Sequence, residues 1–381
     1  MDFERLKNTV PTSPAFLVDE DEILNAVNAL TFLRKQSGCK ILYSIKSLPL
    51  VAVLERVKPS VDGFSVSSLF EARLANEILS GNGDIHLTTP GLRQDECVEL
   101  LDLCSHISCN SISQFQRIAA LPEGRSSLGL RINPKLSFTD DDRYDPCRLH
   151  SKLGCDINSA RNSEILARIK GLHFHTVFGA TDYTPLIQTL AKIQSNLGDK
   201  FAQLEWLNLG GGYLYGKIAD NKDFCEMLNR LKNEFYLKIF IEPGNAVVGK
   251  AGHLLATVLD CFESDGKTIA VLDTSVNHHP EVFEYQRQPE LLEHDPEGRY
   301  PALLAGSTCL AGDLFGEYRF ARRLQTGDKL VFKHVGAYSL VKANRFNGYN
   351  LPDVYSISKG RIKLIKQYTY QMYRQQWASD S

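Results

Sequence analysis

The sequence predicts an α/β protein in which a (β/α)8 barrel is combined with a second, antiparallel β domain. From about residue 41 to residue 242, short apolar runs alternate with polar loops and helical stretches, the order typical of a parallel sheet. Eight such runs occur, the number that a closed barrel requires. After about residue 243, strand-like segments follow one another through turns with little helix between them, which indicates a β domain.

The eight apolar runs are the candidate barrel strands: Ile41–Ile45, Gly63–Val66, Ile85–Leu87, Ile107–Cys109, Leu128–Ile132, Gly171–Phe174, Trp206–Leu209 and Lys238–Ile241. Helical stretches such as Ser68–Leu79 and Thr184–Asn196 separate them. An open doubly wound sheet is the alternative. Its usual G-x-G-x-x-G turn does not follow the first run, so we favour the barrel.

The strand-like segments after the barrel are Leu254–Phe262, Thr268–Asp273, Pro301–Ala305, Asp328–His334 and Gly360–Ile365. The N-terminal run Ala15–Val18 can add a strand to them, because chain termini often lie close together. We therefore expect a barrel domain over residues 20–245 and a β domain built from residues 1–19 and 246–381.

The composition is that of an ordinary globular protein. Of 381 residues 43% are apolar, and 43 basic against 45 acidic residues give a net charge of −2. No basic run suggests nucleic acid or an anionic membrane, and no stretch of ~18 apolar residues suggests a transmembrane helix. Nine cysteines without a C-x-x-C pair, and no signal-peptide pattern, indicate reduced thiols and a cytoplasmic location.

Lys46 follows the first apolar run. Leu42, Ser44 and Lys46 share one face of a period-2 pattern, so in an interior strand the Lys46 amine projects into protein. A desolvated amine has a lowered pKa and can attack carbonyl groups, as Schiff-base lysines do. Taken alone, the segment favours the alternative of a solvated lysine at a strand end.

The later strand ends also carry polar and glycine residues. Gly210–Gly212 directly follows Trp206–Leu209, and three glycines let backbone amides approach a phosphate closely. A flexible turn is the alternative. Glu242-Pro243-Gly244 ends the next run, and its carboxylate needs a cationic partner if it is buried. A surface glutamate that opens a loop is the alternative.

His173 and His175 alternate, so both point to the same side of their strand. A neutral imidazole at a barrel mouth can stack on a flat ring, although a lone histidine is more often a satisfied structural residue. No third ligand at zinc spacing accompanies the pair, so we expect no metal.

These residues and several others occur along the chain in one order: Lys46, His175, Gly210–Gly212, Glu242-Pro243-Gly244, Cys309 within Gly306–Asp313, and Gly336-Ala337-Tyr338. That order resembles the pyridoxal-phosphate amino-acid decarboxylases of the alanine-racemase-like fold (fold type III), over nearly the whole chain. Within this family, the segments 13–19, 43–46 and 277–285 look most like the carboxynorspermidine decarboxylases.

The resemblance implies a pyridoxal 5'-phosphate cofactor and a role for each matching residue. Lys46 would hold the cofactor as a Schiff base, His175 would stack on its ring, and Glu242 would pair with the pyridine nitrogen. A glutamate at that position favours decarboxylation over racemisation. The implied phosphate ligands are Gly211, Gly212, Gly244 and Tyr338, with Arg131 as a more distant partner of the cofactor.

The resemblance also implies that Cys309 donates a proton and reaches the active site from a second subunit, so we expect a homodimer with shared sites. Two residues depart from the pattern. Thr176 stands where relatives carry a phosphate-binding serine, and Leu310 replaces the acidic residue that follows this cysteine in ornithine and diaminopimelate decarboxylases. Leu310 therefore argues against both of those substrates.

The implied reaction is the decarboxylation of carboxynorspermidine or carboxyspermidine in polyamine biosynthesis. A carboxylated triamine carries two further ammonium groups, for which acidic partners are expected. The candidates are Asp273, Glu281, Glu284 and Asp313. The alternatives are a diaminopimelate or other basic amino-acid decarboxylase, and a non-catalytic homologue that binds the cofactor.

Overall fold

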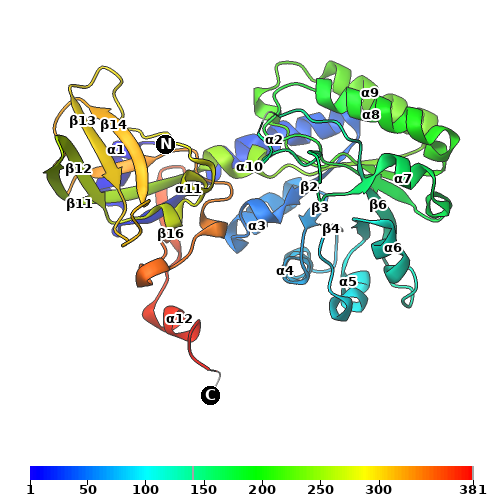
Figure 1. Ribbon diagram of the computed structural model, residues 1–381, viewed down its shortest axis with the longest axis horizontal. Helices are drawn as coiled ribbons and strands as arrows, with labels where there is room; N and C mark the ends of the chain where they lie inside the picture. The colour runs from blue at the N-terminus through cyan, green and yellow to red at the C-terminus, as the bar shows by residue number, and fades with distance from the viewer. Residues whose placement is uncertain (140, 380–381) are drawn as a thin grey trace. The chain divides into compact units, whose positions relative to one another are not determined.

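The computed structural model describes residues 1–139 and 141–379. The chain divides into two compact units (Figure 1). We call Leu24–Val247 the barrel unit, and Met1–Ile23 together with Val248–Ser381 the sheet unit.

The elements alternate in the first unit and are mostly strands in the second. The helices are α1 Phe3–Thr9, α2 Glu20–Ser37, α3 Val51–Val57, α4 Leu69–Leu79, α5 Cys97–Leu103, α6 Ile112–Ile118, α7 Ile157–Arg161, α8 Thr184–Leu197, α9 Lys222–Phe235, α10 Asn245–Val248, α11 Glu281–Tyr285 and α12 Tyr370–Gln375. The strands are β1 Ala15–Asp19, β2 Lys40–Ser44, β3 Gly63–Val66, β4 Asp84–Thr89, β5 His106–Cys109, β6 Ser127–Asn133, β7 Cys155–Asp156, β8 Gly171–His173, β9 Trp206–Asn208, β10 Lys238–Ile241, β11 Gly252–Ser264, β12 Lys267–Leu272, β13 Tyr300–Ala305, β14 Leu314–Phe320, β15 Lys329–Phe332, β16 Asp353–Ser358 and β17 Arg361–Lys366.

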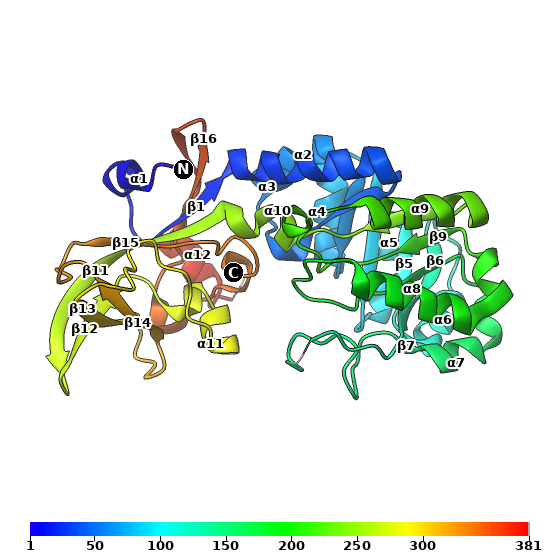
Figure 2. The same ribbon diagram turned by 90° about the horizontal axis from the view of Figure 1, so that it is seen from above.

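The barrel closes as predicted. Within the described residues, eight parallel strands pair in the order β2-β3-β4-β5-β6-β8-β9-β10, and β10 returns to β2 through Phe240↔Lys40 and Ile241↔Ile41. Strand β7 adds a short pairing to β6. The helices lie outside the strands (Figures 1 and 2). Parallel order brings all carboxyl ends of the strands to one end of the barrel, which is where barrel enzymes place their active sites.

The barrel interior is packed around Trp206, which is almost fully buried with Leu42 and Phe240. Strand β8 makes room for this indole through Gly171, where a Cβ atom would lie 2.0 Å from the Trp206 ring. The indole Nε1 donates to Oγ of Ser127 at 2.9 Å, so its polar edge is satisfied. Phe240 and its neighbours on β10 are thereby fixed against β9, and Glu242 follows directly.

In the described residues of the sheet unit the strands pair in the order β14-β13-β12-β11-β1-β16-β17, and β15 also pairs with β11. As expected, the N-terminal strand β1 joins this sheet. Most pairs are antiparallel, as expected, whereas β1–β16 and β12–β13 are parallel. Residues 273–299 connect β12 to β13, a crossover long enough to return the chain to the same end of the sheet.

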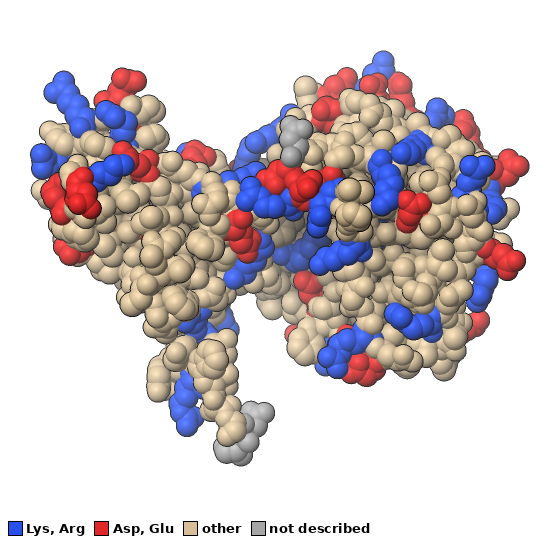
Figure 3. Space-filling model, in the orientation of Figure 1, with Lys and Arg blue, Asp and Glu red and all other residues tan. Residues whose placement is uncertain are grey.

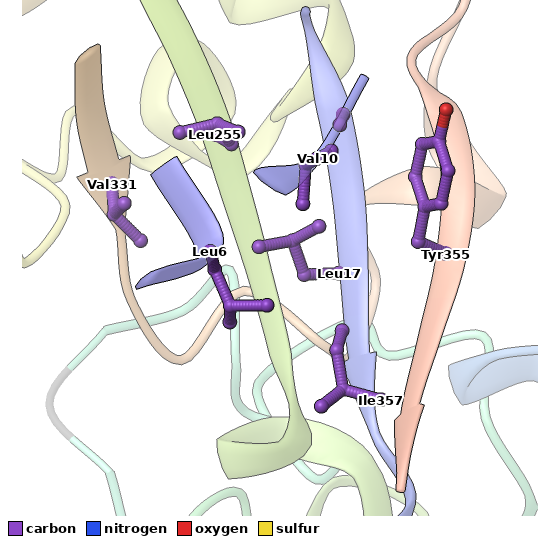
Figure 4. Packing of buried hydrophobic residues seen from close by; sticks show 8 residues of the cluster. Leu6, Val10, Leu17, Leu255, Val331, Tyr355 and Ile357 are labelled. Carbon is purple, nitrogen blue, oxygen red and sulfur yellow. The ribbon is translucent and has the colours of Figure 1, made fainter. Parts of the chain in front are cut away.

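Helix α1 packs against this sheet through Leu6, in the cluster shown in Figure 4. The buried cluster joins the helix to four strands: Leu6, Val10, Ala15, Leu17, Leu255, Val331, Tyr355 and Ile357. The Asp2 side chain accepts from the Arg5 amide at 3.1 Å and caps the helix at its N-terminus. The N-terminal segment is therefore held by both a cap and apolar packing.

Basic and acidic side chains are intermixed over the face of the barrel unit in Figure 3, in keeping with the near-zero net charge. In the part of the chain that the structure describes, none of the helices combines the length and apolarity needed to cross a bilayer.

Candidate active site

Lys46 lies in a turn rather than on a strand. Strand β2 ends at Ser44, and Ile45–Ser47 form one 3-10 turn, so the period-2 pattern does not extend to the lysine. The turn is held by Ser47, whose hydroxyl donates to the Ser44 carbonyl at 2.7 Å. The Ser44 amide donates to the carbonyl of Pro243 at 3.0 Å, which ties the turn to the segment after β10.

The Lys46 side chain is open to solvent, yet protein surrounds its amine closely. Burial lowers the pKa of Lys46, and the nearby Arg131 guanidinium lowers it further. The carboxylates of Glu242 and Glu71 act in the opposite direction without prevailing. A lowered pKa increases the fraction of neutral, nucleophilic amine near pH 7, as a Schiff-base lysine requires.

Glu242 is buried just beyond β10 and is held by two neighbours. Asn208 Nδ2 donates to Oε1 at 2.8 Å, and His173 Nε2 lies 3.6 Å from Oε2. Burial acts to raise the pKa of Glu242, whereas His173, Lys46 and the Asn208 donor lower it and prevail. Burial also lowers the pKa of His173. At neutral pH, therefore, an ionised carboxylate lies beside a neutral imidazole.

His175 is half-buried at the same end of the barrel as Glu242. The Gly211 amide donates to its Nδ1 at 3.1 Å, so Nδ1 is the acceptor and a neutral ring carries its proton on Nε2. Burial, Lys46 and Arg131 hold the pKa of His175 well below its usual range. A Cβ atom at Gly211 would lie 2.2 Å from the Glu242 carbonyl, so only glycine allows this approach.

The amide of Gly211, one of the predicted phosphate ligands, already donates to His175 in this structure. Among the described residues, no partner accepts from the amides of Gly212 or Gly244, which leaves both available to an anion. The Thr176 hydroxyl is buried and lies 3.4 Å from the hydroxyl of Thr189 on α8. The Thr176 hydroxyl thus contacts a helix of the barrel unit.

Arg131 on β6 is buried, and burial lowers its pKa to about 10 while Glu242 opposes the shift. It therefore remains a cation at neutral pH. Glu71 lies in the first turn of helix α4, and its Oε2 accepts from the Ser67 amide at 2.7 Å. Burial raises the pKa of Glu71. Both charges lie close enough to Lys46 to affect its pKa.

Cys309 is exposed in the sheet unit, on a loop whose shape depends on Asp313. The Cys309 amide donates to Asn347 Oδ1 at 2.8 Å. Asp313 is buried, and its carboxylate accepts from the amides of Val276 and Thr308 at 2.8 and 3.0 Å, and from the Thr308 hydroxyl. These contacts hold Asp313 within the Cys309 loop, and its predicted role toward a substrate stays a prediction.

The other predicted acidic residues separate into two groups. Asp273 accepts from the Thr257 amide at 2.8 Å and is tied to the sheet. Glu281 and Glu284 lie 4.0 and 2.6 Å from Nζ of Lys342.

Aromatic rings enclose the same ammonium. The ring centroids of Tyr285 and Tyr338 lie 5.1 and 5.9 Å from Nζ of Lys342. Burial raises the pKa of Tyr338 to about 12, and Glu281 contributes to the shift. Acidic and aromatic groups together are typical of a site for ammonium ions.

Comparison with known proteins places the chain in a family. Residues 16–336 match the family model described as pyridoxal-dependent decarboxylase, C-terminal sheet domain. The chain belongs to the pyridoxal-dependent decarboxylases. It is an enzyme of this class, and its cofactor is pyridoxal phosphate.

Similar decarboxylases are known over the full length of the chain. The carboxynorspermidine/carboxyspermidine decarboxylase of Campylobacter jejuni is 31% identical, over 95% of this chain and 97% of that protein. The carboxyaminopropylagmatine decarboxylase of Synechocystis is 32% identical, over 95% and 94%. The crystal structure of the Campylobacter jejuni carboxynorspermidine decarboxylase with norspermidine superposes with a TM-score of 0.85 at 29% identity, covering 96% of this chain and 100% of that one.

The barrel residues of this decarboxylase fit the cofactor. Pyridoxal phosphate needs an amine for its aldehyde, donors for its phosphate and a partner for its pyridine nitrogen. Lys46 has a lowered pKa, the Gly212 and Gly244 amides have no protein acceptor among the described residues, and Glu242 is held ionised.

Sequence reasoning did not single out Asn208 or Glu71. Asn208 ends an apolar strand and stands two residues before Gly210, a position typical of a turn residue. Glu71 follows Ser68 by three residues, which is the spacing of a helix cap, and the Ser68 hydroxyl does accept from its amide at 3.3 Å. In both cases the sequence pattern predicts only a local structural role, which the residue does have, and gives no sign of its place in the site.

Proposed function

We propose that this decarboxylase removes the carboxylate of carboxynorspermidine or carboxyspermidine and releases norspermidine or spermidine in polyamine biosynthesis. The observation that carries the proposal is the near full-length similarity to the Campylobacter jejuni enzyme, whose crystal structure contains norspermidine. We further propose a cytoplasmic homodimer that acts on this small-molecule substrate.

Two features of the sheet unit support a polyamine substrate. Leu310 follows Cys309, so the acidic residue that would pair with ornithine or diaminopimelate is missing at that position. Glu281, Glu284 and Tyr285 surround the ammonium group of Lys342, and this chemistry suits the distal ammonium groups of a triamine.

The barrel residues would hold the cofactor through separate contacts. Lys46 would bind its aldehyde carbon, Glu242 its pyridine nitrogen, and His175 the face of its ring. The amides of Gly212 and Gly244 would hold its phosphate. The cofactor supplies an electron sink for the electron pair that departing carbon dioxide leaves behind.

The protein contributes the charges that make this sink effective. Glu242 is ionised and in contact with a neutral imidazole and an amide donor, so it can keep a proton on the nitrogen it faces. Arg131 remains cationic at the same end of the barrel and balances the buried carboxylate. His175, neutral and locked by the Gly211 amide, presents an uncharged ring.

Cys309 would complete the reaction by donating a proton from Sγ to the carbon that loses its carboxylate. Its thiol is exposed, and its amide donates to Asn347, which is flanked in the chain by the exposed residues Phe346 and Tyr349. Exposed aromatic residues of this kind are enriched at protein interfaces. They support a second copy of the chain as the partner of this surface.

The substrate proposal is tested by measuring carbon dioxide release from carboxynorspermidine, carboxyspermidine, carboxyaminopropylagmatine, diaminopimelate and ornithine. We expect the first two to give the highest kcat/KM. The second candidate function is the decarboxylation of carboxyaminopropylagmatine, favoured by the 32% identity to the Synechocystis enzyme. Faster turnover of that substrate would support it. Preference for diaminopimelate or ornithine would overturn the proposal, and cofactor binding without release from any substrate would indicate a non-catalytic homologue.

Shared active sites are tested by mixing two inactive variants, Lys46→Ala and Cys309→Ala. Random exchange makes half of the dimers mixed, and each mixed dimer has one intact site of two, so about a quarter of the wild-type activity should return. Light scattering before and after mixing gives the oligomeric state. A dimer that exchanges subunits but recovers no activity would contradict the sharing of sites.

A further inference from the structure

Asn208 joins the two parts of the cofactor site within the barrel. Its Oδ1 accepts from the Gly210 amide at 2.9 Å, and its Nδ2 donates to Glu242 at 2.8 Å. A backbone N–H can only donate, so the carbonyl oxygen of the side chain must face Gly210 and the amide nitrogen must face Glu242. One fully buried amide thus fixes both the start of the glycine loop and the carboxylate.

The second hydrogen of Asn208 Nδ2 points to His86 on β4. Nδ1 of His86 lies 3.2 Å from Nδ2, and since the amide nitrogen can only donate, Nδ1 must carry a lone pair. His86 is therefore neutral, with its proton on Nε2. Burial and the neighbouring His106 hold the pKa of His86 well below its usual range, which agrees with this assignment.

The His86 ring cannot rotate freely. It stacks on His106 with ring centroids 4.0 Å apart and an interplanar angle of 27°, and Phe240 packs on it at 4.2 Å. His106 is in turn held through Nδ1 by the Ser105 hydroxyl at 2.9 Å. This packing keeps Nδ1 of His86 directed toward Asn208.

Asp84, His86 and His106 have ligand atoms within 4.8 Å of one another, which raises the question of a metal ion. Lys40 already supplies a cation to Asp84 at 2.7 Å, which argues against it. His86 contacts Asn208 through Nδ1 and His106 stacks on His86, so these two rings are explained as the support of Asn208.

We propose that His86 is a positioning residue for decarboxylation, whose unprotonated Nδ1 locks the Asn208 amide and so orients both Glu242 and the glycine loop. The proposal rests on the proposed role of Glu242 toward the pyridine nitrogen. It adds a residue that touches neither substrate nor cofactor and acts through Asn208 alone.

Removing the acceptor has a defined consequence. Without Nδ1, one Asn208 hydrogen has no partner in a buried site, and the rotation of the amide that would relieve this places its oxygen against the Glu242 carboxylate. The same rotation breaks the contact to the Gly210 amide. Both the carboxylate and the glycine loop lose their fixed positions together.

The first test uses the wild-type apoenzyme. A long-range 1H–15N spectrum of histidine-labelled protein, with His86 assigned by the His86→Asn variant, reports which ring nitrogen carries the proton. We expect neutral His86 with the proton on Nε2. A proton on Nδ1, or a charged ring at pH 7.5, would overturn the proposal independently of any activity measurement.

The second test compares two substitutions. His86→Leu removes the acceptor, whereas His86→Asn keeps one, because Oδ1 of asparagine is as many bonds from Cα as Nδ1 of histidine. We expect His86→Leu to weaken pyridoxal phosphate binding about tenfold and to lower kcat about tenfold, and His86→Asn to restore most of both. His106→Phe, which keeps a stacked ring, is the matched control.

The nitrogen-15 shift of labelled pyridoxal phosphate in the holoenzyme separates this inference from the proposed function. His86→Leu should move the pyridine shift toward the unprotonated value, as Glu242→Gln does. If only Glu242→Gln moves it, the role of His86 is wrong. If neither moves it, the proposed role of Glu242 fails instead. Equal losses in His86→Leu and His86→Asn, accompanied by equal losses in melting temperature, would reduce His86 to a packing residue.

Discussion

The buried carboxylate of the barrel and the acidic cluster of the sheet unit hold charge in two different ways. Glu242 is buried, and its neighbours Asn208 and His173 are almost fully buried with it. Glu281 and Glu284 are partly exposed, and their partner is the flexible side chain of Lys342. A buried network fixes geometry for one reaction, whereas an exposed acidic cluster with a movable partner can accept related cations. Under the proposed function, the barrel would carry the chemistry and the acidic cluster would bind the substrate.

Lys46→Ala should have the largest effect, because the amine is the covalent attachment in the proposed mechanism. We expect the visible absorption band of the bound cofactor to disappear and kcat to fall by more than about a thousandfold. Absorbance after cofactor addition and carbon dioxide release measure the two. Lys40→Met, at the N-terminal end of strand β2, is the control. A coloured and active Lys46→Ala enzyme would remove Lys46 from the site.

Glu242→Gln should lower kcat about a hundredfold, because the ionised partner of the pyridine nitrogen is lost. The same carboxylate affects stability. Its pKa is lowered in the folded state, so it stabilises the fold above about pH 4.5, and this contribution is lost as the pH falls further.

Urea unfolding at several pH values measures this contribution. The difference in unfolding free energy between wild type and Glu242→Gln should stay constant from about pH 6 to 8 and shrink below about pH 5. Glu205→Gln, an exposed residue paired with Lys170, should show little of this dependence. A difference that grows on acidification would contradict the assigned direction of the pKa shift.

Glu281→Gln tests the acidic cluster and should separate KM from kcat. If this residue binds a distal ammonium group, KM for the carboxylated triamine should rise about tenfold, while kcat stays within about twofold. Asp273→Asn, which is tied to Thr257, should leave KM unchanged. A fall in kcat without a change in KM would assign Glu281 to the chemical step rather than to substrate binding. The contrast between the barrel and the acidic cluster would then be wrong.

Thr176→Val should have the smallest effect. The Thr176 hydroxyl faces Thr189, so we expect cofactor affinity to change by less than about threefold and stability by about 1 kcal/mol. Fluorescence titration with pyridoxal phosphate and thermal unfolding measure the two. A large loss of affinity with unchanged stability would restore the phosphate role that relatives give to this position.

The barrel was predictable because its strands are buried on both faces and therefore read as continuous apolar runs. The strands β14 and β16 were not predicted. Leu314–Phe320 alternates exposed and buried residues around a glycine and charged side chains, and Asp353–Ser358 lies among polar and turn residues. The parallel pairs β1–β16 and β12–β13 depend on long connections, which carry no local pattern.

For the site, the sequence could indicate residues at strand ends but not their partners across the barrel. His86 stands inside the apolar run Ile85–Leu87, where it reads as an interruption. Its contact to Asn208 joins β4 to β9, and such pairs become neighbours only when the barrel closes. Lys342 was missed for the same reason, because Glu281 and Glu284 lie about sixty residues away in the chain.

The position of Lys342 also means that its ammonium group competes with free amines for Glu281 and Glu284. A lysine ammonium among two glutamates and two tyrosine rings is a tethered occupant, and a short tether gives it an effective concentration in the millimolar range. Under the proposed function, a free amine must outcompete it to reach the same carboxylates. Ligands with two ammonium groups can do so by bridging, whereas an amino acid with one distal ammonium gains less. The enzyme would then discriminate between substrates by their number of ammonium groups as well as by their length.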